Sequence, residues 1–467
     1  MRHNLPIDTD AYKIVHHLQR QQNINKLISY GEPRLGGHYP EVCFIGAQPI
    51  IMQHFMQPIT KEMIQEGIEE SYSTFGTDKF FNKEVWEKVM NLGYLPLKIM
   101  TVPEGTIVQE GNVCFTMEST EPWFANMLSH FEDMLMWTWY PTAVCTRSMN
   151  IKKNIIPAFR KSSDVTRMTL PFAVNDFGLR GGTMFEGAVM GGIGHLVHFE
   201  GSDNMPASRM IKDFYGYKGR AKSVWATEHS VATPYGSDEG EFEYIKAQLN
   251  QFTNMTKSIV IDSYDADNFM LNVVGSEEIK KLIIAHEGRI VFRPDSGKPI
   301  TNVCKYSDIL GGIFGFHLNS KGYKVLNHNI GIIQGDGMNE ESIPELYNEY
   351  IKTGWAADNI ITGSGGGLLE EGLTRDTQRW AIKACYGERD GVPFDIRKTP
   401  KTDMTKQSKG GKLKLHRTSP NGYMTIESSK ETPQMFNSYV DELRPLYNNG
   451  ELFLDTFDNI MERAAKF

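Results

Sequence analysis

A pattern that recurs about every thirty residues between positions 258 and 367 constrains the fold more than any other feature of the sequence. In each copy a run of apolar and β-branched residues stops abruptly at polar residues or glycines, and a segment with helical periodicity follows. The four copies reach the motifs DSYD (262–265), RPDSG (293–297), QGDG (334–337) and GSGGG (363–367). Four consecutive units of strand, polar turn and helix predict a parallel sheet whose carboxyl edge collects the polar groups.

The same pattern starts before these four units. Apolar runs at 170–174, 195–199 and 223–226 each lead into polar residues, and a further strand is expected near 381–386. This number of strands predicts an α/β fold with an irregular α/β barrel, in which residues far apart in sequence converge on one face.

The sequence outside the barrel predicts two further parts. An N-terminal α+β domain is expected at 1–165, with antiparallel strands and interface helices, and the barrel with the active site is expected at 166–390. The C-terminal part, 391–467, is expected to hold a basic loop, a hairpin and a helix that returns to the N-terminal domain. Its stretch 397–417 contains eight Lys and Arg residues, and Asn421-Gly422 is a typical hairpin turn.

Composition excludes several classes of protein. The chain has 467 residues, a formal net charge of −8 and 40% hydrophobic residues, which is typical of a soluble protein with two or three domains. This charge does not favour binding of nucleic acid by the whole surface. No apolar run is long enough to span a membrane, and the amino terminus lacks the apolar core of a signal peptide, so we expect a cytoplasmic protein. The five cysteines are widely spaced, which favours reduced thiols over a disulfide framework or a zinc site.

The strand ends carry groups that suit a phosphorylated sugar. Arginine matches phosphate oxygens in a bidentate geometry, glycine frees backbone N–H groups for phosphate, and acids hold ribose hydroxyls or Mg²⁺. These residues are Arg180, Arg293, Arg375, Asp203, Asp262, Asp265, Asp295, Asp336, His229 and the glycines at 365–367. A sugar phosphate or diphosphate is therefore the predicted class of ligand.

Each of these signals also has a structural interpretation. The Arg-Pro-Asp at 293–295 can be an ion pair, and the glycines at 365–367 also suit tight turns. His229 taken alone is more often an ordinary surface histidine, and the basic stretch is often a solvated loop. The repetition of polar groups at successive strand ends favours the functional interpretation.

Ten short motifs, in order over nearly the whole chain, resemble the nicotinate/nicotinamide phosphoribosyltransferase family. They are DAYKIVH (10–16), DFGLRG (176–181), GSD (201–203), EHS (228–230), DSYD, RPDSG, QGDG, GSGGGLL (363–369), LTRD (373–376) and LHRT (415–418). The resemblance implies a barrel like that of type II phosphoribosyltransferases. It also implies a pentosyltransferase of NAD salvage, which forms nicotinamide mononucleotide and diphosphate from nicotinamide and 5-phosphoribosyl 1-pyrophosphate (PRPP). Mg²⁺, ATP as an optional coupled co-substrate, a phosphohistidine and a homodimer with a shared active site are further implications.

The resemblance also assigns roles to residues. His229 resembles the phosphorylated histidine, while Asp262 and Asp295 resemble the acids that hold the ribose and Mg²⁺. Phe177, with Tyr12 of the partner subunit, resembles the aromatic pair around the pyridine ring. Other substrate-binding positions implied by the motifs are Asp203 for the carboxamide, Arg180, His229 and Arg293 for the pyrophosphate, and Gly335, Asp336, Gly366 and Arg375 for the nucleotide ribose and 5′-phosphate.

Three alternatives remain open at this point. The nearest is an enzyme of the same family that prefers nicotinate, which Asp203 disfavours because a carboxylate repels the carboxylate of nicotinate. The second is a non-catalytic nucleotide-binding regulatory protein, and the third is a different barrel enzyme that acts on a sugar phosphate.

Overall fold

The structure is a computed structural model that describes residues 3–401, 407–420 and 422–467. Lys406 of the basic stretch and Asn421 of the predicted hairpin turn lie outside the described residues. The chain divides into two compact units. The first unit comprises Met1–Thr146, Ile211–Tyr217 and Gly372–Phe467, and the second comprises Arg147–Met210 and Lys218–Glu371. The three predicted domain ranges stay a prediction.

An antiparallel sheet is the centre of the first unit, and its strand order is β15-β14-β1-β5-β3-β18-β19. Its strands are β1 (Ile24–Glu32), β3 (Leu97–Thr101), β5 (Phe115–Ser119), β14 (Ala381–Arg389), β15 (Val392–Asp395), β18 (Arg444–Asn448) and β19 (Glu451–Leu452). Two small antiparallel sheets pair β2 (Glu41–Cys43) with β4 (Ile107–Gln109), and β16 (Leu413–Ser419) with β17 (Gly422–Glu427). The antiparallel strands predicted within 98–118 and the hairpin around Gly422 are confirmed.

The strand predicted for the barrel near 381–386 is wrong in its placement. This segment is β14, which pairs with β1 along its whole length, from Ile24 opposite Arg389 to Glu32 opposite Ala381. The pairing buries Ile382, Cys385 and Tyr386 in the core of the antiparallel sheet. A short apolar run does not reveal whether its partner strand is parallel or antiparallel, which explains the error.

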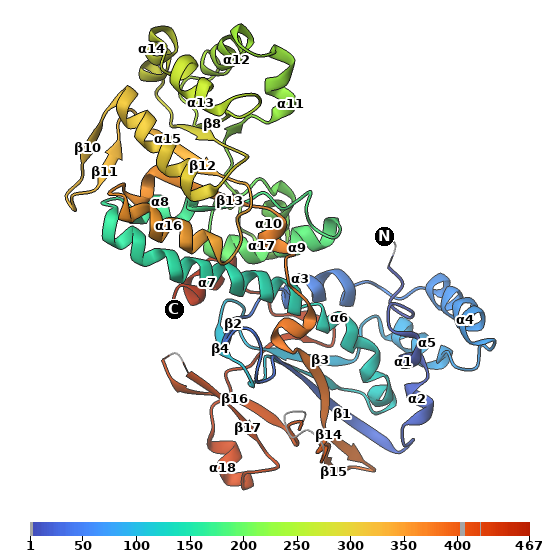
Figure 1. The fold of residues 1–467 in the computed structure, drawn as a ribbon. Helices are drawn as coiled ribbons and strands as arrows, with labels where there is room; N and C mark the ends of the chain where they lie inside the picture. The colour runs from blue at the N-terminus through green and yellow to red at the C-terminus, as the bar shows by residue number, and fades with distance from the viewer. Residues whose placement is uncertain (1–2, 402–406, 421) are drawn as a thin grey trace. The chain divides into compact units, whose positions relative to one another are not determined.

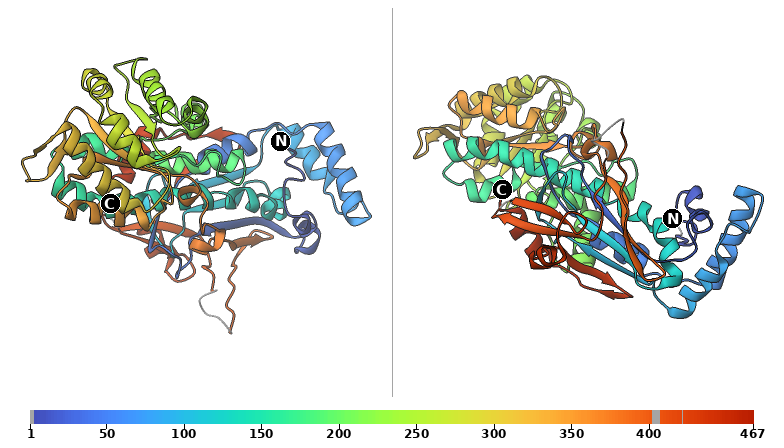
Figure 2. Two further views of the ribbon diagram at one scale, coloured as in Figure 1. Left: turned by 45° about the horizontal axis from the view of Figure 1, so that its top comes forward. Right: turned by 90° about the horizontal axis from the view of Figure 1, so that it is seen from below.

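Two helices of the first unit, α4 (Lys61–Phe75) and α5 (Lys83–Leu92), begin and end at standard capping residues. In α4 the side chain of Thr60 accepts a hydrogen bond from the N–H of Met63, and α5 is capped in the same way by Asn82. Each ends at a glycine with positive φ. The two helices lie side by side (Figures 1 and 2). The other helices are α1 (Ala11–Ile14), α2 (His16–Gln19), α3 (Ala47–Ile50), α6 (Glu132–Met136), α18 (Pro433–Ser438) and α19 (Phe457–Ala464).

A parallel sheet with strand order β6-β13-β12-β9-β8-β7 is the centre of the second unit. Its strands are β6 (Val174–Asp176), β7 (Trp225–Ala226), β8 (Lys257–Val260), β9 (Ile290–Arg293), β12 (Ile330–Gln334) and β13 (Ile360–Ser364). Isolated parallel bridges from Asp176 to Ser202 and from Gly201 to Lys222 continue the pairing beyond β6. All residues of β8 and β12 are buried, as expected for strands covered on both faces. The predicted α/β class, an irregular parallel barrel with separate antiparallel strands, is confirmed.

Helices follow the strands of this sheet, as the periodicity predicts. For example, α15 packs on β12 and on its neighbour α16 (Figure 1). The helices are α8 (Thr166–Thr169), α9 (Phe185–His198), α11 (His229–Ala232), α12 (Glu239–Leu249), α13 (Ala266–Asn268), α14 (Glu277–Ala285), α15 (Pro299–Phe314), α16 (Ser342–Lys352) and α17 (Gly366–Leu369). The hairpin of β10 (Phe316–Leu318) and β11 (Lys324–Leu326) follows α15, while α7 (Trp139–Ser162) and α10 (Met205–Tyr215) have residues in both units.

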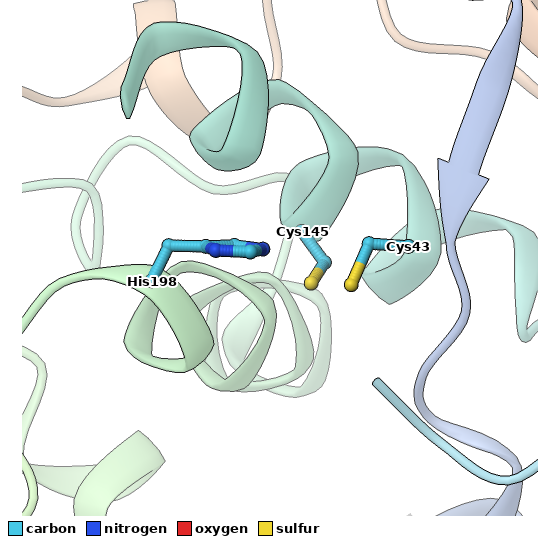
Figure 3. A group of neighbouring side chains, drawn as sticks. All are labelled: Cys43, Cys145 and His198. Carbon is cyan, nitrogen blue, oxygen red and sulfur yellow. The ribbon is translucent and has the colours of Figure 1, made fainter. Parts of the chain in front are cut away.

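All five cysteines are free thiols. Cys43, at the end of β2, and Cys145, on α7, belong to the first unit, and their sulfur atoms face one another (Figure 3). His198, also labelled there, belongs to the second unit. Burial raises the pKa of the Cys145 thiol well above its ordinary value, so this thiol is protonated and unreactive at neutral pH.

No helix in the described part of the chain combines the length and the apolar content that crossing a bilayer requires.

Glu104 is a buried carboxyl group in the first unit. It accepts hydrogen bonds from the N–H of Gly46 (2.9 Å), the N–H of Gln48 (2.8 Å) and the hydroxyl of Tyr215 (2.6 Å). Burial is the main cause that raises the pKa of Glu104 from 4.5 to about 7. The folded protein therefore keeps a proton here at pH values where the unfolded chain has lost it.

We expect this proton to make the unfolding free energy fall as pH rises from 4.5 to about 7, because the unfolded state binds fewer protons in this window. Glu104→Gln keeps an acceptor oxygen and removes the ionisation. Between pH 4.5 and about 7, the unfolding free energy of this variant should therefore fall less than that of the wild type, by an amount on the order of 3 kcal/mol. Urea denaturation at a series of pH values measures this, with the exposed Glu70→Gln as the control. An unchanged pH slope in Glu104→Gln would contradict the assignment.

Candidate active site

Four of the predicted residues meet at the carboxyl ends of β7, β8 and β9. Nε2 of His229 lies 3.1 Å from Oδ1 of Asp262, and Nδ1 lies 3.8 Å from Oδ2 of Asp295. Nη1 of Arg293 lies 2.5 Å from Oδ1 of Asp295. The parallel sheet thus brings an imidazole, two carboxylates and a guanidinium into one cluster.

Asp262 holds this cluster together. Its side chain is only 6% exposed, and its Oδ2 accepts hydrogen bonds from the N–H of Asp295 (2.8 Å) and the hydroxyl of Ser296 (2.6 Å). Because a carboxylate only accepts, the proton shared with His229 is carried by Nε2. Nδ1 is then the ring nitrogen without a proton; it lies beside Oδ2 of Asp295, and the His229 side chain as a whole is 41% exposed.

Arg293 is held in place by a buried polar network formed by Thr227 and Tyr244. Its Nη2 donates to the carbonyl oxygen of Thr227 (3.1 Å), and the Thr227 hydroxyl lies 2.7 Å from the hydroxyl of Tyr244. Burial raises the pKa of Tyr244 to about 12, so this phenol is neutral. The guanidinium is 15% exposed and has little freedom to turn away from the cluster.

Phe177 gives the site a flat apolar surface. An added Cβ on Gly363 would lie 2.0 Å from Cε2 of the Phe177 ring, and one on Gly335 would lie 3.5 Å from the same atom. The ring therefore lies over the ends of β12 and β13, and only the absence of a side chain at Gly363 makes room for it, since a Cβ on Gly335 would be at an ordinary contact distance. The position of a Cβ on Gly335 is also 4.0 Å from Oδ1 of Asp295, so the ring adjoins the charged cluster.

Asp203 is an exposed carboxylate next to β6, the strand that ends just before Phe177. Its backbone N–H donates to the carbonyl oxygen of Asp176 (3.0 Å), the residue before Phe177. One carboxylate oxygen accepts a hydrogen bond from the hydroxyl of Ser223. The side chain is thus oriented but open to solvent.

The glycine-rich turn after β13 is held by Arg147. This buried guanidinium donates to the carbonyl oxygens of Gly367 (3.1 Å), Leu368 (3.1 Å) and Glu371 (2.6 Å), and its Nε donates to Glu340 (3.3 Å). A cation at the carboxyl end of α17 satisfies carbonyl groups that the short helix leaves free. A Cβ on Gly366 would meet nothing within 4 Å, so the backbone there is open to a ligand.

The donor set of the cluster fits a magnesium ion. Asp262, Asp295 and Ser296 supply carboxylate and hydroxyl oxygens, and Mg²⁺ is usually bound by one or two carboxylates together with substrate phosphates. In the described structure the carboxylate oxygens are directed at His229, Arg293 and the N–H of Asp295, and the Ser296 hydroxyl donates to Asp262. Binding of the ion would use their remaining lone pairs.

Comparison with known proteins identifies the family of this chain. The model of the nicotinate phosphoribosyltransferase (NAPRTase) family matches residues 172–451, and that of the nicotinamide phosphoribosyltransferase N-terminal domain matches residues 4–99. The chain belongs to the nicotinate phosphoribosyltransferase family. A nicotinamide phosphoribosyltransferase of Xanthomonas campestris is 35% identical over 99% of this chain and 98% of its own length. One from Acinetobacter baylyi is 28% identical over 98% of this chain and 96% of its own length.

Two solved structures share the fold of this chain. A nicotinate-nucleotide pyrophosphorylase from Pyrococcus furiosus aligns with a TM-score of 0.62 at 14% identity, over 99% of this chain and 95% of that one. Human nicotinic acid phosphoribosyltransferase aligns with a TM-score of 0.58 at 13% identity, over 98% and 93% of the two chains. At such low identity these structures show the architecture alone.

The remaining predicted residues of the second unit lie on the same sheet edge but make fewer contacts. The side chain of Arg180 is 92% exposed and lies 4.0 Å from Glu228. Asp336 is also exposed, directly after Gly335. These side chains are free to reorient toward a ligand.

Two predicted residues, Tyr12 and Arg375, belong to the first unit. Tyr12 is 58% exposed, and Arg375 pairs with Asp376 at 2.8 Å. Their predicted roles stay predictions.

Sequence reasoning did not assign roles to Ser223, Ser296, Arg147 or Gly363. Ser296 was visible within RPDSG, but nothing in the sequence distinguishes Ser223 or Arg147 from other surface or helix residues.

We expect Gly363→Ala to displace the Phe177 ring, because the new methyl group would occupy the position of its edge. The matched control is Gly366→Ala, which adds the same group in open space. Overpacking typically costs about 1–3 kcal/mol, so Gly363→Ala should also be the less stable variant. Crystal structures and urea denaturation of both variants measure this. If the Phe177 ring of Gly363→Ala has the same position as in the wild type, the ring does not pack against this glycine.

Proposed function

We propose that this chain is a nicotinamide phosphoribosyltransferase, which joins nicotinamide to the phosphoribosyl group of PRPP and releases diphosphate. The observation that carries the proposal is the meeting of two kinds of surface at Gly335. A Cβ on this glycine would lie 3.5 Å from the Phe177 ring and 4.0 Å from Oδ1 of Asp295 of the charged cluster, so both groups border the same small space. A flat base and a charged sugar phosphate must meet in this way for a bond between them to form. The names of the relatives from Xanthomonas and Acinetobacter support the same assignment.

The residues suggest how the reaction proceeds. The pyridine ring stacks on Phe177, and its nitrogen attacks C1 of the ribose as the bond from C1 to the diphosphate oxygen breaks. Arg293 and Arg180 stabilise the negative charge that grows on the departing diphosphate, which leaves with the electron pair of that bond. Asp262 and Asp295 stabilise the positive charge that develops at C1. When bound, Mg²⁺ supplies further neutralisation of the diphosphate charge.

Asp203 supports nicotinamide as the preferred base. A carboxylate accepts a hydrogen bond from the carboxamide NH₂, whereas the carboxylate of nicotinate brings a like charge without a proton to share. The hydrogen bond from Ser223 keeps one oxygen of Asp203 oriented and leaves the other free.

Product formation from nicotinamide or nicotinate, each with PRPP and Mg²⁺, tests the function by mass spectrometry. We expect nicotinamide mononucleotide to dominate, with kcat/KM higher for nicotinamide by at least about tenfold, and Asp203→Asn to narrow the ratio because it removes the like charge.

Nicotinate mononucleotide as the main product would instead identify a nicotinate-preferring enzyme. No product from either base would favour the non-catalytic nucleotide-binding alternative.

We further propose that ATP hydrolysis is coupled to this reaction through phosphorylation of His229. The γ-phosphoryl group would pass from ATP to Nδ1 with release of ADP, because Nε2 carries the proton directed at Asp262. Asp262 also stabilises the positive charge that the ring gains. Cleavage of the phosphohistidine by water then completes ATP hydrolysis.

Incubation with ATP and Mg²⁺, followed by intact-mass measurement at alkaline pH, tests this step. We expect one added phosphoryl group on the wild-type protein and none on His229→Ala, because the acceptor nitrogen is gone. The matched control is His317→Ala, which removes an exposed histidine of the β10 strand and should leave phosphorylation unchanged. Equal phosphorylation of His229→Ala and the wild type would refute the assignment.

We also propose that the protein acts as a cytoplasmic homodimer with a shared active site, in which Tyr12 reaches the site of the partner subunit. The motif at 10–16 supports this, together with the exposure of the Tyr12 ring.

A further inference from the structure

Asp176 is a fully buried carboxyl group that the proposed reaction does not use. It ends β6 and its exposed fraction is 0%. Its Oδ1 accepts a hydrogen bond from the N–H of Gly178 (2.7 Å), and its Oδ2 accepts from the side-chain amide of Asn204 (3.2 Å) and from the hydroxyl of Ser202 (3.5 Å). A buried acid with this many donors is held in a single orientation.

The two oxygens of Asp176 bond to two different turns. Oδ1 bonds to the turn that follows Phe177, and Oδ2 bonds to the residues on both sides of Asp203. The backbone repeats the connection, because the N–H of Asp176 donates to Gly201 (3.1 Å) and its carbonyl oxygen accepts from the N–H of Asp203 (3.0 Å). One side chain therefore joins the turn with the aromatic ring to the turn with the exposed carboxylate.

The second turn has its own links to neighbouring helices. The amide of Asn204 also donates to the carbonyl oxygen of Ala188 in α9 (2.9 Å), and its oxygen accepts from the N–H of Ala207 in α10 (3.1 Å). The hydroxyl of Ser202 accepts from the N–H of Asn204 (3.0 Å). Of these groups, only Asp176 also bonds to the Phe177 turn.

We propose that Asp176 is a positioning residue that sets the specificity of the base site, by fixing the carboxylate of Asp203 relative to the ring of Phe177. The proposal rests on the proposed function, since it concerns the choice between nicotinamide and nicotinate at the same site. A base that is stacked on Phe177 and has its nitrogen directed at C1 of the ribose can present its substituent in few directions, so discrimination depends on where Asp203 lies relative to that ring.

The side chain of Asp176 never touches the base, so its effect must pass through Asp203. This separates positioning from a general contribution to folding. A merely structural residue would change kcat/KM for both bases by the same factor, and its effect would be independent of Asp203.

Asp176→Asn tests the proposal. The amide oxygen can keep the bond from Gly178, while the new NH₂ group faces the NH₂ group of Asn204, so the side-chain bond to the Asp203 turn is lost and the bond to the Phe177 turn is kept. The backbone bonds to Gly201 and Asp203 remain, so we expect the Asp203 turn to shift rather than to detach. We expect the ratio of kcat/KM for nicotinamide over nicotinate to fall about tenfold, as for the loss of one hydrogen bond to a charged group, with less than about a twofold change in KM for PRPP. In the Asp203→Asn background the same substitution should change the ratio by less than about twofold.

Two further variants accompany it. Ser202→Ala removes only the 3.5 Å contact and one turn hydrogen bond, so it should lower the ratio in the same direction by a smaller factor. Asn359→Asp is the matched control. It replaces an amide with a carboxyl group, the opposite of Asp176→Asn, at a buried residue directly before β13. Its side chain makes three hydrogen bonds of its own, so the exchange should lower thermal stability and leave the ratio unchanged.

An equal loss of activity on both bases in Asp176→Asn would overturn the proposal, as would additive effects of Asp176→Asn and Asp203→Asn. If Asp176→Asn does not fold, Ser202→Ala is the test of the proposal. A ratio of kcat/KM for nicotinamide over nicotinate that is unchanged in Ser202→Ala would then overturn the proposal.

A crystal structure of the ligand-free variant provides a test that does not need activity. We expect Asp203 to be displaced and Phe177 to stay in place. If the wild type forms no product, the proposed function fails, and an unmoved Asp203 in this crystal structure would independently show that Asp176 does not position it.

Discussion

The carboxylate of Asp262 is the contact on which the charged cluster depends. It is the residue after Ile261 at the end of β8, between β7 and β9 in the sheet, and it bonds to groups that follow both neighbours. Its bond to His229 orients the imidazole, and its bonds to Asp295 and Ser296 fix the turn after Arg293. The parallel sheet makes this possible, because strand ends that lie far apart in sequence become adjacent when the strands run in the same direction.

The site combines two groups of polar residues with different degrees of freedom. Arg147, Asp176 and Asp262 have little or no exposure, and their hydrogen bonds are made within the second unit. Arg180, Asp203 and Asp336 are exposed at the same edge. Buried polar groups must be partnered to be tolerated, so they form a rigid frame. The exposed groups leave part of their hydrogen-bonding capacity to a ligand.

Much of this arrangement was predictable because the sequence repeats a recognisable unit. The ends of β8, β9, β12 and β13 were located from apolar runs that stop at polar residues, and His229, Asp262, Arg293 and Asp295 do come together. The placement of β14 was not predictable, because the sequence of a short apolar strand does not indicate which strand it pairs with. The roles of Ser223 and Arg147 were also not predictable. The role of a serine in a loop or an arginine in a helix depends on its contacts with residues that are distant in sequence.

The close contact between the Phe177 ring and Gly363 also restricts how this site can change over evolutionary time. The ring occupies space that a side chain at position 363 would need. A larger residue at 363 becomes acceptable only after residue 177 has become smaller, whereas a smaller residue at 177 is sterically acceptable immediately. The two positions are therefore expected to change in a fixed order, and a lineage that retains the aromatic ring also retains the glycine beneath it, although this glycine needs no contact with the substrate.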